Sequence, residues 1–447
     1  MFKTLANAWK IPDLRKKILF TLFIIVIYRI GSKIPVPFVD IIGGGLLAST
    51  GDSATFLNYL SMMTGDAFNY GTIFALSITP YINSSIIIQL LTVAIPPLER
   101  LSKEGEEGRK KIAKITRYMT LGLGLLQSVA YYIYLRSQNY LYNTNKDEIG
   151  VQVFQAIVII LVLTAGTTLV MWLGEQINGK GIGNGISIIL FAGIVSRIPT
   201  EMEMLFSTKQ GAEGYIMHGG IYYFLCPFVI VCYLLMIAFI VWMDNAERRI
   251  PVQYAKRVVG RKMYGGQSTH IPIKVNMSGV MPVIFASSIL SLPPTIQMFV
   301  SSRLSEDSMW HTFFGWFEPT SVVYAVLFFL MIIFFAYFYA AIQYNPTEMA
   351  NNIRNNSGTI PGIRPGKPTA HYIEKIISRI ILLGALLLSV VALFPTLFTI
   401  ITEKTLEQGM NISLGGTSII IMVGVALETV KQLESQMMLR HYKGFLD

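Results

Sequence analysis

The segment Pro80-Tyr-Ile82-Asn83-Ser84-Ser85-Ile86-Ile-Ile88-Gln89-Leu90 has a counterpart far along the chain, and this pair decides how the rest is organised. The counterpart reads Pro282-Val-Ile284-Phe-Ala286-Ser287-Ser288-Ile289-Leu290. Both begin with a proline, which costs little in the first turn of a helix, and both carry a Ser-Ser pair inside an apolar run. Paired serines let membrane helices approach one another closely. Proline-marked apolar segments at matching places in two halves of a chain indicate a transport site between the halves.

The composition is typical of a membrane protein. Of the 447 residues, 53% are hydrophobic and only 14% are charged, whereas a soluble domain carries about 25% charged residues. Eight stretches without Asp, Glu, Lys or Arg are long enough to cross a bilayer, which takes roughly 20 residues. They lie between the charged residues at 66 and 99, 117 and 136, 148 and 175, 213 and 244, 274 and 303, 318 and 348, 379 and 403, and 407 and 428. The sequence therefore predicts an all-α, polytopic membrane protein.

Two shorter apolar segments, Ile18–Tyr28 and Gly181–Ser196, are ambiguous as spans. The first is similar to a signal-peptide core, but no small-residue cleavage site follows it. If both segments cross the membrane and the amino terminus is cytoplasmic, 28 of the 36 basic residues lie inside and 8 outside; without them the split is 24 to 12. Basic loops stay in the cytoplasm, so ten spans with both termini inside is the better prediction. The same bias accounts for most of the net charge of +10.

A hydrophilic external loop, residues 201–216, divides the ten predicted spans into two halves of five, residues 1–200 and 217–447. Because five is an odd number, the second half enters the membrane in the opposite orientation, as an inverted repeat requires. The two proline-marked segments are then the second span of each half.

Two basic cytosolic loops of the second half, residues 244–274 and 348–379, have the composition of ordered turns. The first alternates apolar and polar residues around a glycine-rich turn, which predicts a protruding hairpin. In the second loop, prolines and glycines fix the backbone around Arg364. The positive-inside bias explains the charge of these loops but not their turns, so we expect a docking surface for a partner.

Two segments allow more than one interpretation. The short apolar stretch Phe56–Met63 is either a surface loop or a re-entrant half-helix that lies in protein or in an aqueous cavity. The run Gly181-Ile-Gly183-Asn-Gly185 invites a phosphate-loop interpretation, but it lacks the full spacing and a preceding strand. Glycines that permit a tight turn into a short, closely packed helix are the better interpretation.

Residue types that carry enzyme or metal chemistry are scarce. Cys226 and Cys232 share one apolar span without metal-ligand spacing, and the five histidines are scattered, so the sequence predicts neither a metal nor a cofactor. The eight clear spans hold no charged residue, whereas ion-driven transporters normally keep one for coupling. A secondary transporter of small solutes remains an alternative, with Asn83, Gln89, Gln127 and hydroxyls as its candidate ligands near the midplane. A membrane-embedded enzyme needs paired catalytic groups within its spans, and the sequence offers none.

Five segments of the chain share their residues with one known family. They are Phe74–Leu91, Trp172–Ser187, Gln267–Asn276, Pro361–Gly366 and Gly415–Ser418. In this order, and spread over nearly the whole chain, they resemble the SecY family, the protein-conducting channels of the bacterial general secretory pathway. The resemblance implies an hourglass-shaped pore between two inverted halves of five helices. Such a protein conducts secretory polypeptides across the membrane and releases signal sequences and membrane helices sideways into lipid, and it is not an enzyme.

The resemblance also assigns residues to parts of the pore. The narrow apolar ring would be Ile78, Ile82, Leu190, Ile284, Ile296 and Ile421. Leucine at 190 departs from an all-isoleucine ring but keeps its apolarity and volume. A short re-entrant plug helix would lie at about residues 56–70, with Phe56, Leu57, Leu60, Met63, Gly65 and Tyr70. The lateral gate between the two proline-marked spans would carry Ser84, Ser85, Gln89, Asn276, Ser287 and Ser288.

By the same resemblance, the two cytosolic loops dock the partners of the channel. The docking residues would be Arg248, Arg249, Lys256, Arg257, Arg261, Lys262, Arg354, Arg364 and Lys367. The implied partners are SecE, SecG, the SecA ATPase, the translating ribosome, signal peptides and nascent chains, and membrane lipids. Exposed arginines suit a ribosome because ribosomal RNA is a polyanion. The implied location is the bacterial plasma (inner) membrane, and the energy would come from SecA, from ribosomal synthesis or from the proton-motive force.

An apolar ring also suits such a passage on physical grounds. A polypeptide channel must pass any side chain, so it cannot present specific polar sites or strong charges. A ring of branched aliphatic residues dewets a constriction and stops ions. Helix packing by itself explains each of these aliphatic residues, and only the resemblance indicates that they form a ring.

Overall fold

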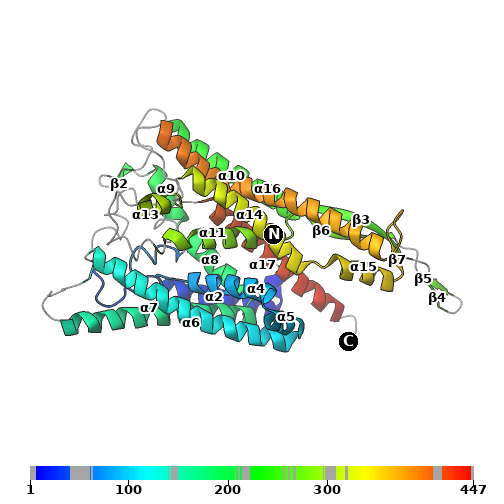
Figure 1. The fold of residues 1–447 in the computed structure, drawn as a ribbon, viewed down its shortest axis with the longest axis horizontal. Coiled ribbons are helices and arrows are strands. Elements are labelled where there is room, and N and C mark those ends of the chain that lie inside the picture. Colours follow the sequence, from blue (N-terminus) through cyan, green and yellow to red (C-terminus); the bar gives the residue numbers. More distant parts are fainter. Residues whose placement is uncertain are drawn as a thin grey trace.

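The computed structural model is a bundle of long helices that run side by side, with a small sheet at one end (Figure 1). It describes residues 7–40, 61, 64–138, 140–141, 149–206, 208–209, 212–213, 222–254, 257–259, 262–264, 268–294, 296, 309–317, 321–405 and 415–443. The first half contains α2 (Pro12–Gly31), α4 (Thr79–Ala94), α5 (Pro96–Lys103), α6 (Glu106–Ser137), α7 (Ile149–Lys180), α8 (Gly185–Val195) and α9 (Ile198–Phe206). The second half contains α10 (Tyr222–Asn245), α11 (Met281–Leu290), α13 (Met309–Gly315), α14 (Val322–Gln343), α15 (Pro346–Asn355), α16 (Lys367–Thr405) and α17 (Gly416–Lys443).

A helix lies within each of the ten predicted spans. By length and composition, six of the described helical stretches can cross a bilayer, and the bent pair α4–α5 would be a seventh. The helices α2, α6 and the short α11 do not meet that criterion. The structure therefore shows a polytopic membrane bundle that is consistent with ten spans without fixing that number.

The second predicted span begins as a helix only at Thr79, because residues before it form turns. Pro80 occupies the first turn of α4, where its missing N–H costs nothing. Ser77, three residues earlier, has φ 47°, a conformation that no helix interior accepts. At its other end α4 stops at Ile95, since Pro96 and Pro97 force an extended residue before them, and α5 leaves at an angle of 101°.

The glycine run between α7 and α8 forms a tight turn into a closely packed helix, as the sequence predicts. Gly183 has φ +84°, and the Asn184 side chain caps α8 by accepting a hydrogen bond from the Ile186 N–H at 3.2 Å. A Cβ on Gly185 would collide with the backbone carbonyl of Gly174 in α7. This position therefore requires glycine because α7 and α8 touch backbone to backbone there.

The predicted hairpin of the first cytosolic loop is confirmed. Strand β3 (Glu247–Tyr254) pairs antiparallel with β6 (Ser268–Lys274), and the short strands β4 (Arg257–Val259) and β5 (Lys262–Tyr264) pair farther out. The strand β7 (Gly358–Thr359) of the second cytosolic loop adds to the free edge of β3, with Tyr254 opposite Gly358. The two loops that the sequence predicts to be cytosolic are therefore one structural unit. A further short hairpin, β1 (Thr208–Lys209) with β2 (Ala212–Glu213), lies within residues 201–216, which the sequence predicts to be an external loop.

The helices of the bundle pack in a closed circuit. Around it, α6 contacts α4, α4 contacts α11, α11 contacts α14, and α14 contacts α16. The circuit returns through α17, α8 and α7 to α6. In Figure 1 the first-half helices α4, α6 and α7 form one side and α10, α14 and α16 the other, with α8, α11 and α17 between them. The two halves therefore meet along two seams, α4 against α11 and α8 against α17.

Candidate functional site

Five of the six predicted ring residues belong to one buried apolar cluster at the centre of the bundle. They are Ile78, Ile82, Leu190, Ile284 and Ile421, and none of them is more than 7% exposed. These five residues lie on α4 and its amino-terminal cap, on α8, on α11 and on α17. The same four helices form the two seams. These five predicted ring residues therefore lie on the helices through which the two halves meet, with members from each half.

The structure does not bring Ile296 to the other five. Its side chain is 53% exposed and lies outside the buried cluster. Helix α11, which carries Ile284, ends at Leu290, before position 296. The structure therefore places five of the six predicted ring residues in one buried cluster and Ile296 outside it, and the ring itself stays a prediction.

A cavity of about 780 Å³ opens on the side of the ring that carries the sheet. Ile284 contributes to its wall, together with charged and amide side chains from α10, α17 and the segment before α11. Asn276 is 7% exposed and donates a hydrogen bond from Nδ2 to Asp244 Oδ1 at 2.6 Å, and Lys431 Nζ lies 3.4 Å from the Asp244 carbonyl oxygen. The cavity therefore has both polar and apolar walls, and Ile284 is the one predicted ring residue among those that line it.

The predicted lateral-gate residues lie mainly on α4 and α11, which contact each other. Ser84 donates to the Pro80 carbonyl at 2.8 Å, and Ser287 donates to the Ile284 carbonyl at 3.0 Å. Because each hydroxyl is satisfied inside its own helix, separating α4 from α11 would not remove that partner. Ser288 is buried on α11, Ser85 accepts from Gln89 on α4, and Asn276 instead contacts α10 beside the cavity.

Four of the predicted plug residues, Phe56, Leu57, Leu60 and Met63, lie outside the described residues. The two others are described: Gly65 is buried, and Tyr70 is 42% exposed with the Lys33 ammonium 5.1 Å from its ring centre. The backbone next to Gly65 is tied to two spans. Tyr28 of α2 donates to the Thr64 carbonyl at 3.5 Å, and Tyr131 of α6 donates to the Phe68 carbonyl at 2.7 Å.

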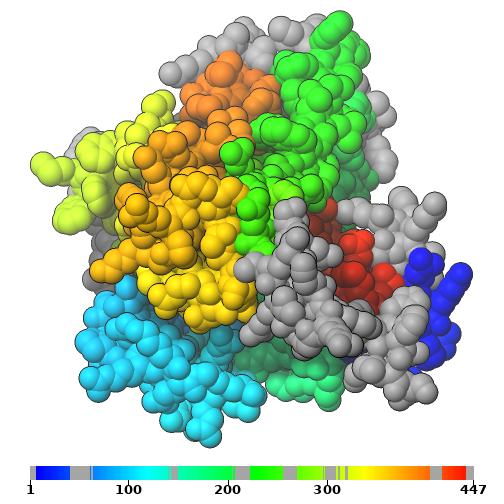
Figure 2. Space-filling model, turned by 90° about the vertical axis from the view of Figure 1, so that its right-hand side faces the viewer, coloured from blue at the N-terminus to red at the C-terminus, as the bar shows by residue number. Residues whose placement is uncertain are grey.

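The predicted docking residues that the structure describes gather at the sheet end of the bundle. Arg248, Arg249, Arg354, Arg364 and Lys367 are exposed, and Arg249 pairs with Glu247 at 2.7 Å. Arg257 and Lys262 lie on β4 and β5, whereas Lys256 and Arg261 lie outside the described residues. Figure 2 views the molecule from this end and shows α15 and the start of α16, in yellow to orange, on the exposed face.

Two glycines shape the loop that presents Arg364. Gly362 has φ +81° and Gly366 has φ +104°, which a side chain would strain. The Thr369 hydroxyl donates to the Arg364 carbonyl at 2.9 Å and closes the turn. The sequence does not predict the strand β7, which anchors this loop to β3, because a strand of two residues has no periodic pattern. Its only signal is Gly358, where a Cβ would approach Tyr254 and Ile353 within 3.0 and 3.1 Å.

Two smaller cavities bear on the alternative of a solute transporter. A cavity of about 40 Å³ brings Asn83 and Gln127, two of the candidate ligands, together with the Tyr131 side chain. It has room for water rather than for a solute. Gln89, the third, is bonded to Ser85 instead.

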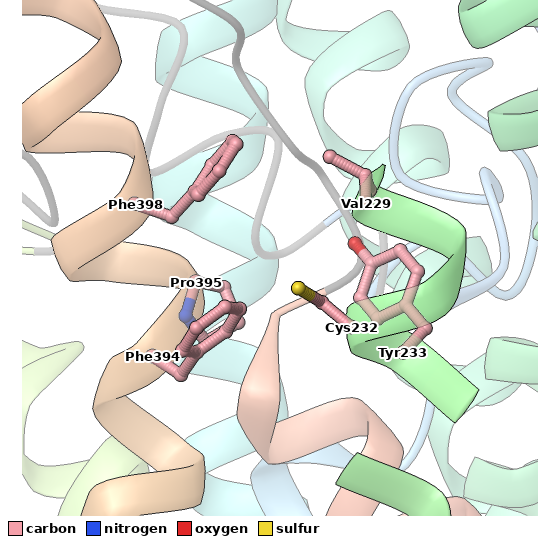
Figure 3. A pocket seen from close by; sticks show the side chains of 6 residues that line it. All are labelled: Val229, Cys232, Tyr233, Phe394, Pro395 and Phe398. Carbon is pink, nitrogen blue, oxygen red and sulfur yellow. The ribbon is translucent and has the colours of Figure 1, made fainter. Parts of the chain in front are cut away.

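The second small cavity lies between α10 and α16 at the Pro395 position of α16 (Figure 3). Its volume is about 10 Å³, and its walls are Val229, Cys232, Tyr233, Phe394, Pro395 and Phe398. A space of this size holds at most about one water molecule. This cavity is therefore a packing gap beside a proline in a helix and not a binding site.

Comparison with known proteins gives a consistent result. The family model of SecY matches residues 72–430 of this chain. A protein of Streptomyces griseus named "Protein translocase subunit SecY" is 45% identical over 457 residues, which covers 100% of both chains. A protein of the same name from Mycobacterium tuberculosis is 42% identical over 456 residues, again with 100% of both chains covered.

Solved structures share the fold at low sequence identity. One described as "The structure of a protein conducting channel" has a TM-score of 0.60 and 17% identity, and the match covers 94% of this chain and 92% of that one. Another, "Sec61 in the Canine ribosome-channel complex from the endoplasmic reticulum", has a TM-score of 0.57 and 15% identity, with 94% and 92% covered.

Proposed function

This chain belongs to the SecY family, and on that premise we propose that it is the central channel subunit of a bacterial protein translocase. It conducts secretory polypeptides across the membrane and releases signal sequences and membrane helices sideways into lipid. The observation that carries the proposal is that five aliphatic side chains from the four seam helices belong to one buried cluster, and that one of them, Ile284, lines the cavity of about 780 Å³.

The physical properties of that arrangement match the task. Branched aliphatic side chains offer water and ions no partner, so a constriction made of them resists wetting and conduction. They also bind no particular side chain, so a polypeptide of any sequence can slide past. The polar cavity beside the ring holds the chain in water until it reaches the constriction.

The seam between α4 and α11 is the proposed lateral gate. Its buried serines are small, which lets the helices pack closely, and their hydroxyls are bonded within their own helices. Opening therefore costs mainly apolar contacts, and an apolar signal sequence or a membrane helix can replace those contacts. The other seam, α8 with α17, then keeps the two halves, residues 1–200 and 217–447, together around the external loop 201–216.

The remaining parts follow from the family. Residues at about 56–70 form the plug that closes the pore. SecE braces the halves, SecG joins them, and SecA or the translating ribosome docks on the unit formed by β3, β6, β7 and the Arg364 loop. The protein resides in the bacterial inner membrane with both termini in the cytoplasm, and its partners supply the energy.

A crosslink tests the proposed passage directly. With Cys226 and Cys232 changed to alanine, a single cysteine at Ile82 is expected to form a disulfide with a secretory chain that carries one cysteine and is stalled in mid-passage. The matched control is Val93→Cys on the same helix, whose side chain is 53% exposed on the bundle surface. If no disulfide forms at position 82 while an exposed cytosolic cysteine still reacts, the result would favour a solute transporter over a protein channel.

Reversing the charge at the tip of the second cytosolic loop is expected to impair docking. Arg364→Glu should lower SecA-driven export by about tenfold and leave assembly of the channel unchanged. The Arg364 side chain is exposed, and the turn is closed by the Thr369 hydroxyl on the Arg364 carbonyl, which the substitution keeps. Lys375→Glu on α16, also exposed, makes the same charge change outside the predicted surface. Export at the normal rate in the Arg364 variant would remove this residue from the docking surface.

A further inference from the structure

Arg197 directly precedes α9, which lies at the end of the bundle opposite the sheet (Figure 1), and it contacts two carboxylates. Its Nε atom is 3.5 Å from Asp66 Oδ1, and its Nη2 atom is 3.3 Å from Glu201 Oε1. The three side chains are 5%, 17% and 8% exposed, respectively. Buried charges such as these lose most of their hydration, so each one depends on its charged partners for stabilisation.

The two carboxylates belong to different parts of the chain. Glu201 is on α9, four positions from Arg197, so this pair is local and stays together wherever the helix goes. Asp66 is far away in sequence, beside Gly65 at the end of the proposed plug segment. The contact between Arg197 and Asp66 is therefore the one that moves if the plug moves.

The turn that carries Asp66 is seated against two helices. A Cβ on Gly65 would meet Arg29 Nη1 at 2.7 Å and both Gly193 O and Ser196 Oγ at 2.9 Å, so only glycine fits there. Arg29 Nη1 also lies 3.4 Å from the Gly65 carbonyl oxygen, and Ser61 donates to Asp66 Oδ1 at 3.1 Å. These contacts of the Gly65 backbone and the Ser61 hydroxyl hold the Asp66 carboxylate in a defined position next to Arg197.

We propose that Arg197 is a latch for the plug and that Glu201 sets the strength of the latch. The inference rests on the proposed function of residues 56–70 as a plug. When the plug leaves, the Asp66 carboxylate passes into water, while the Arg197 guanidinium keeps Glu201 and is not left as an uncompensated buried charge. The presence of Glu201 therefore makes opening reversible and less costly.

A guanidinium shared between two carboxylates binds each of them more weakly than it would bind one alone. The two acids therefore have opposite effects on the closed state, although they touch the same arginine. Removing the Asp66 charge weakens the latch. Removing the Glu201 charge removes the carboxylate that competes with Asp66 for Arg197 and therefore strengthens the latch.

The test compares Asp66→Asn with Glu201→Gln in the complete translocase, since both substitutions keep volume and remove one charge. The readout is resting ion conductance in planar bilayers, together with the rate at which translocation begins. Asp66→Asn is expected to raise resting conductance about tenfold, because a weaker latch lowers the fraction of channels in the closed state. Glu201→Gln is expected to lower it below that of the unmodified protein and to delay the start of translocation.

Two further variants sharpen the comparison. Arg197→Lys keeps the charge but loses the forked geometry, so its conductance should lie between those of the unmodified protein and Asp66→Asn. Arg117→Gln removes an ion pair of 2.6 Å with Glu175 on the other side of the membrane and should change nothing.

A conductance change in the same direction for both acid variants would show a merely structural role and overturn the latch, as would an unchanged Asp66→Asn variant. The crosslink at position 82 is measured in each protein to separate this result from the proposed function. A retained crosslink with unchanged conductance rejects the latch alone, whereas a missing crosslink in the otherwise unmodified protein rejects the channel.

Discussion

Replacing Ile82 and Ile284 together by serine is expected to raise the resting ion conductance of the channel by more than about tenfold. The two side chains are 6% and 7% exposed, come from α4 and α11, and face the same buried cluster. Each substitution removes a branched aliphatic group and adds a hydroxyl that can hold water in the constriction. A wetted constriction conducts ions, because an ion can then keep part of its hydration shell. The measurement is single-channel or ensemble conductance in planar bilayers without a translocating chain.

The position of the two residues, rather than the added hydroxyl, must cause the leak. Val93→Ser places the same hydroxyl on α4 at a side chain that is 53% exposed, and its resting conductance should match that of the unmodified protein. Glycine at 82 and 284 should leak as serine does, since it also removes the aliphatic groups. A double serine variant that stays electrically tight would mean that these residues do not form the seal.

Replacing Gly185 by alanine is expected to destabilise the protein by about 1–3 kcal/mol, although alanine is normally the better helix former. The reason is the backbone contact between α7 and α8: the new Cβ would overlap the Gly174 carbonyl and lie 2.9 Å from Ile177 Cβ. Backbone atoms cannot turn away as a flexible side chain can, so the two helices must separate. Since α8 carries Leu190, the separation also displaces one member of the ring.

Gly179→Ala provides the matched control for this effect. Gly179 lies in the same turn region of α7, but nothing lies within 4 Å of the position that its Cβ would occupy. This variant should be neutral or stabilised by up to about 1 kcal/mol, the usual gain in helix propensity. Thermal unfolding midpoints of the purified proteins in detergent decide the comparison. Equal midpoints for the two variants would show that the contact between Gly185 and Gly174 is not tight.

Several features were predictable because their signals are local. Long uncharged apolar runs predict where helices lie, and a proline predicts where one begins, as Pro80 does for α4. Alternating residues around a glycine-rich turn predict the β3–β6 hairpin, which the structure contains. The glycines at 181–185 predict a tight, closely packed start for α8, and the contact of Gly185 with Gly174 confirms it.

Other features depend on which segments meet in space, and no local pattern records that. The addition of β7 to β3 joins two loops through a strand of two residues. The separation of Ile296 from the buried cluster that holds the other five predicted ring residues is not recorded in any local pattern either. The contact between Asp66 and Arg197 links residues 131 positions apart, and neither neighbourhood predicts the other.

The sequence by itself determined the membrane class, the ten apolar segments and the hairpin. Through the family's motifs it also pointed to six residues as a ring, five of which lie in one buried cluster. Those features follow from hydrophobicity, backbone preferences and charge, which act over a few residues. Only the tertiary structure decided that α4, α8, α11 and α17 form the two seams and that Arg197 joins α9 to the turn at Asp66. Such contacts depend on the free energy of the whole packed bundle, in which helices distant in sequence compete for the same apolar surfaces.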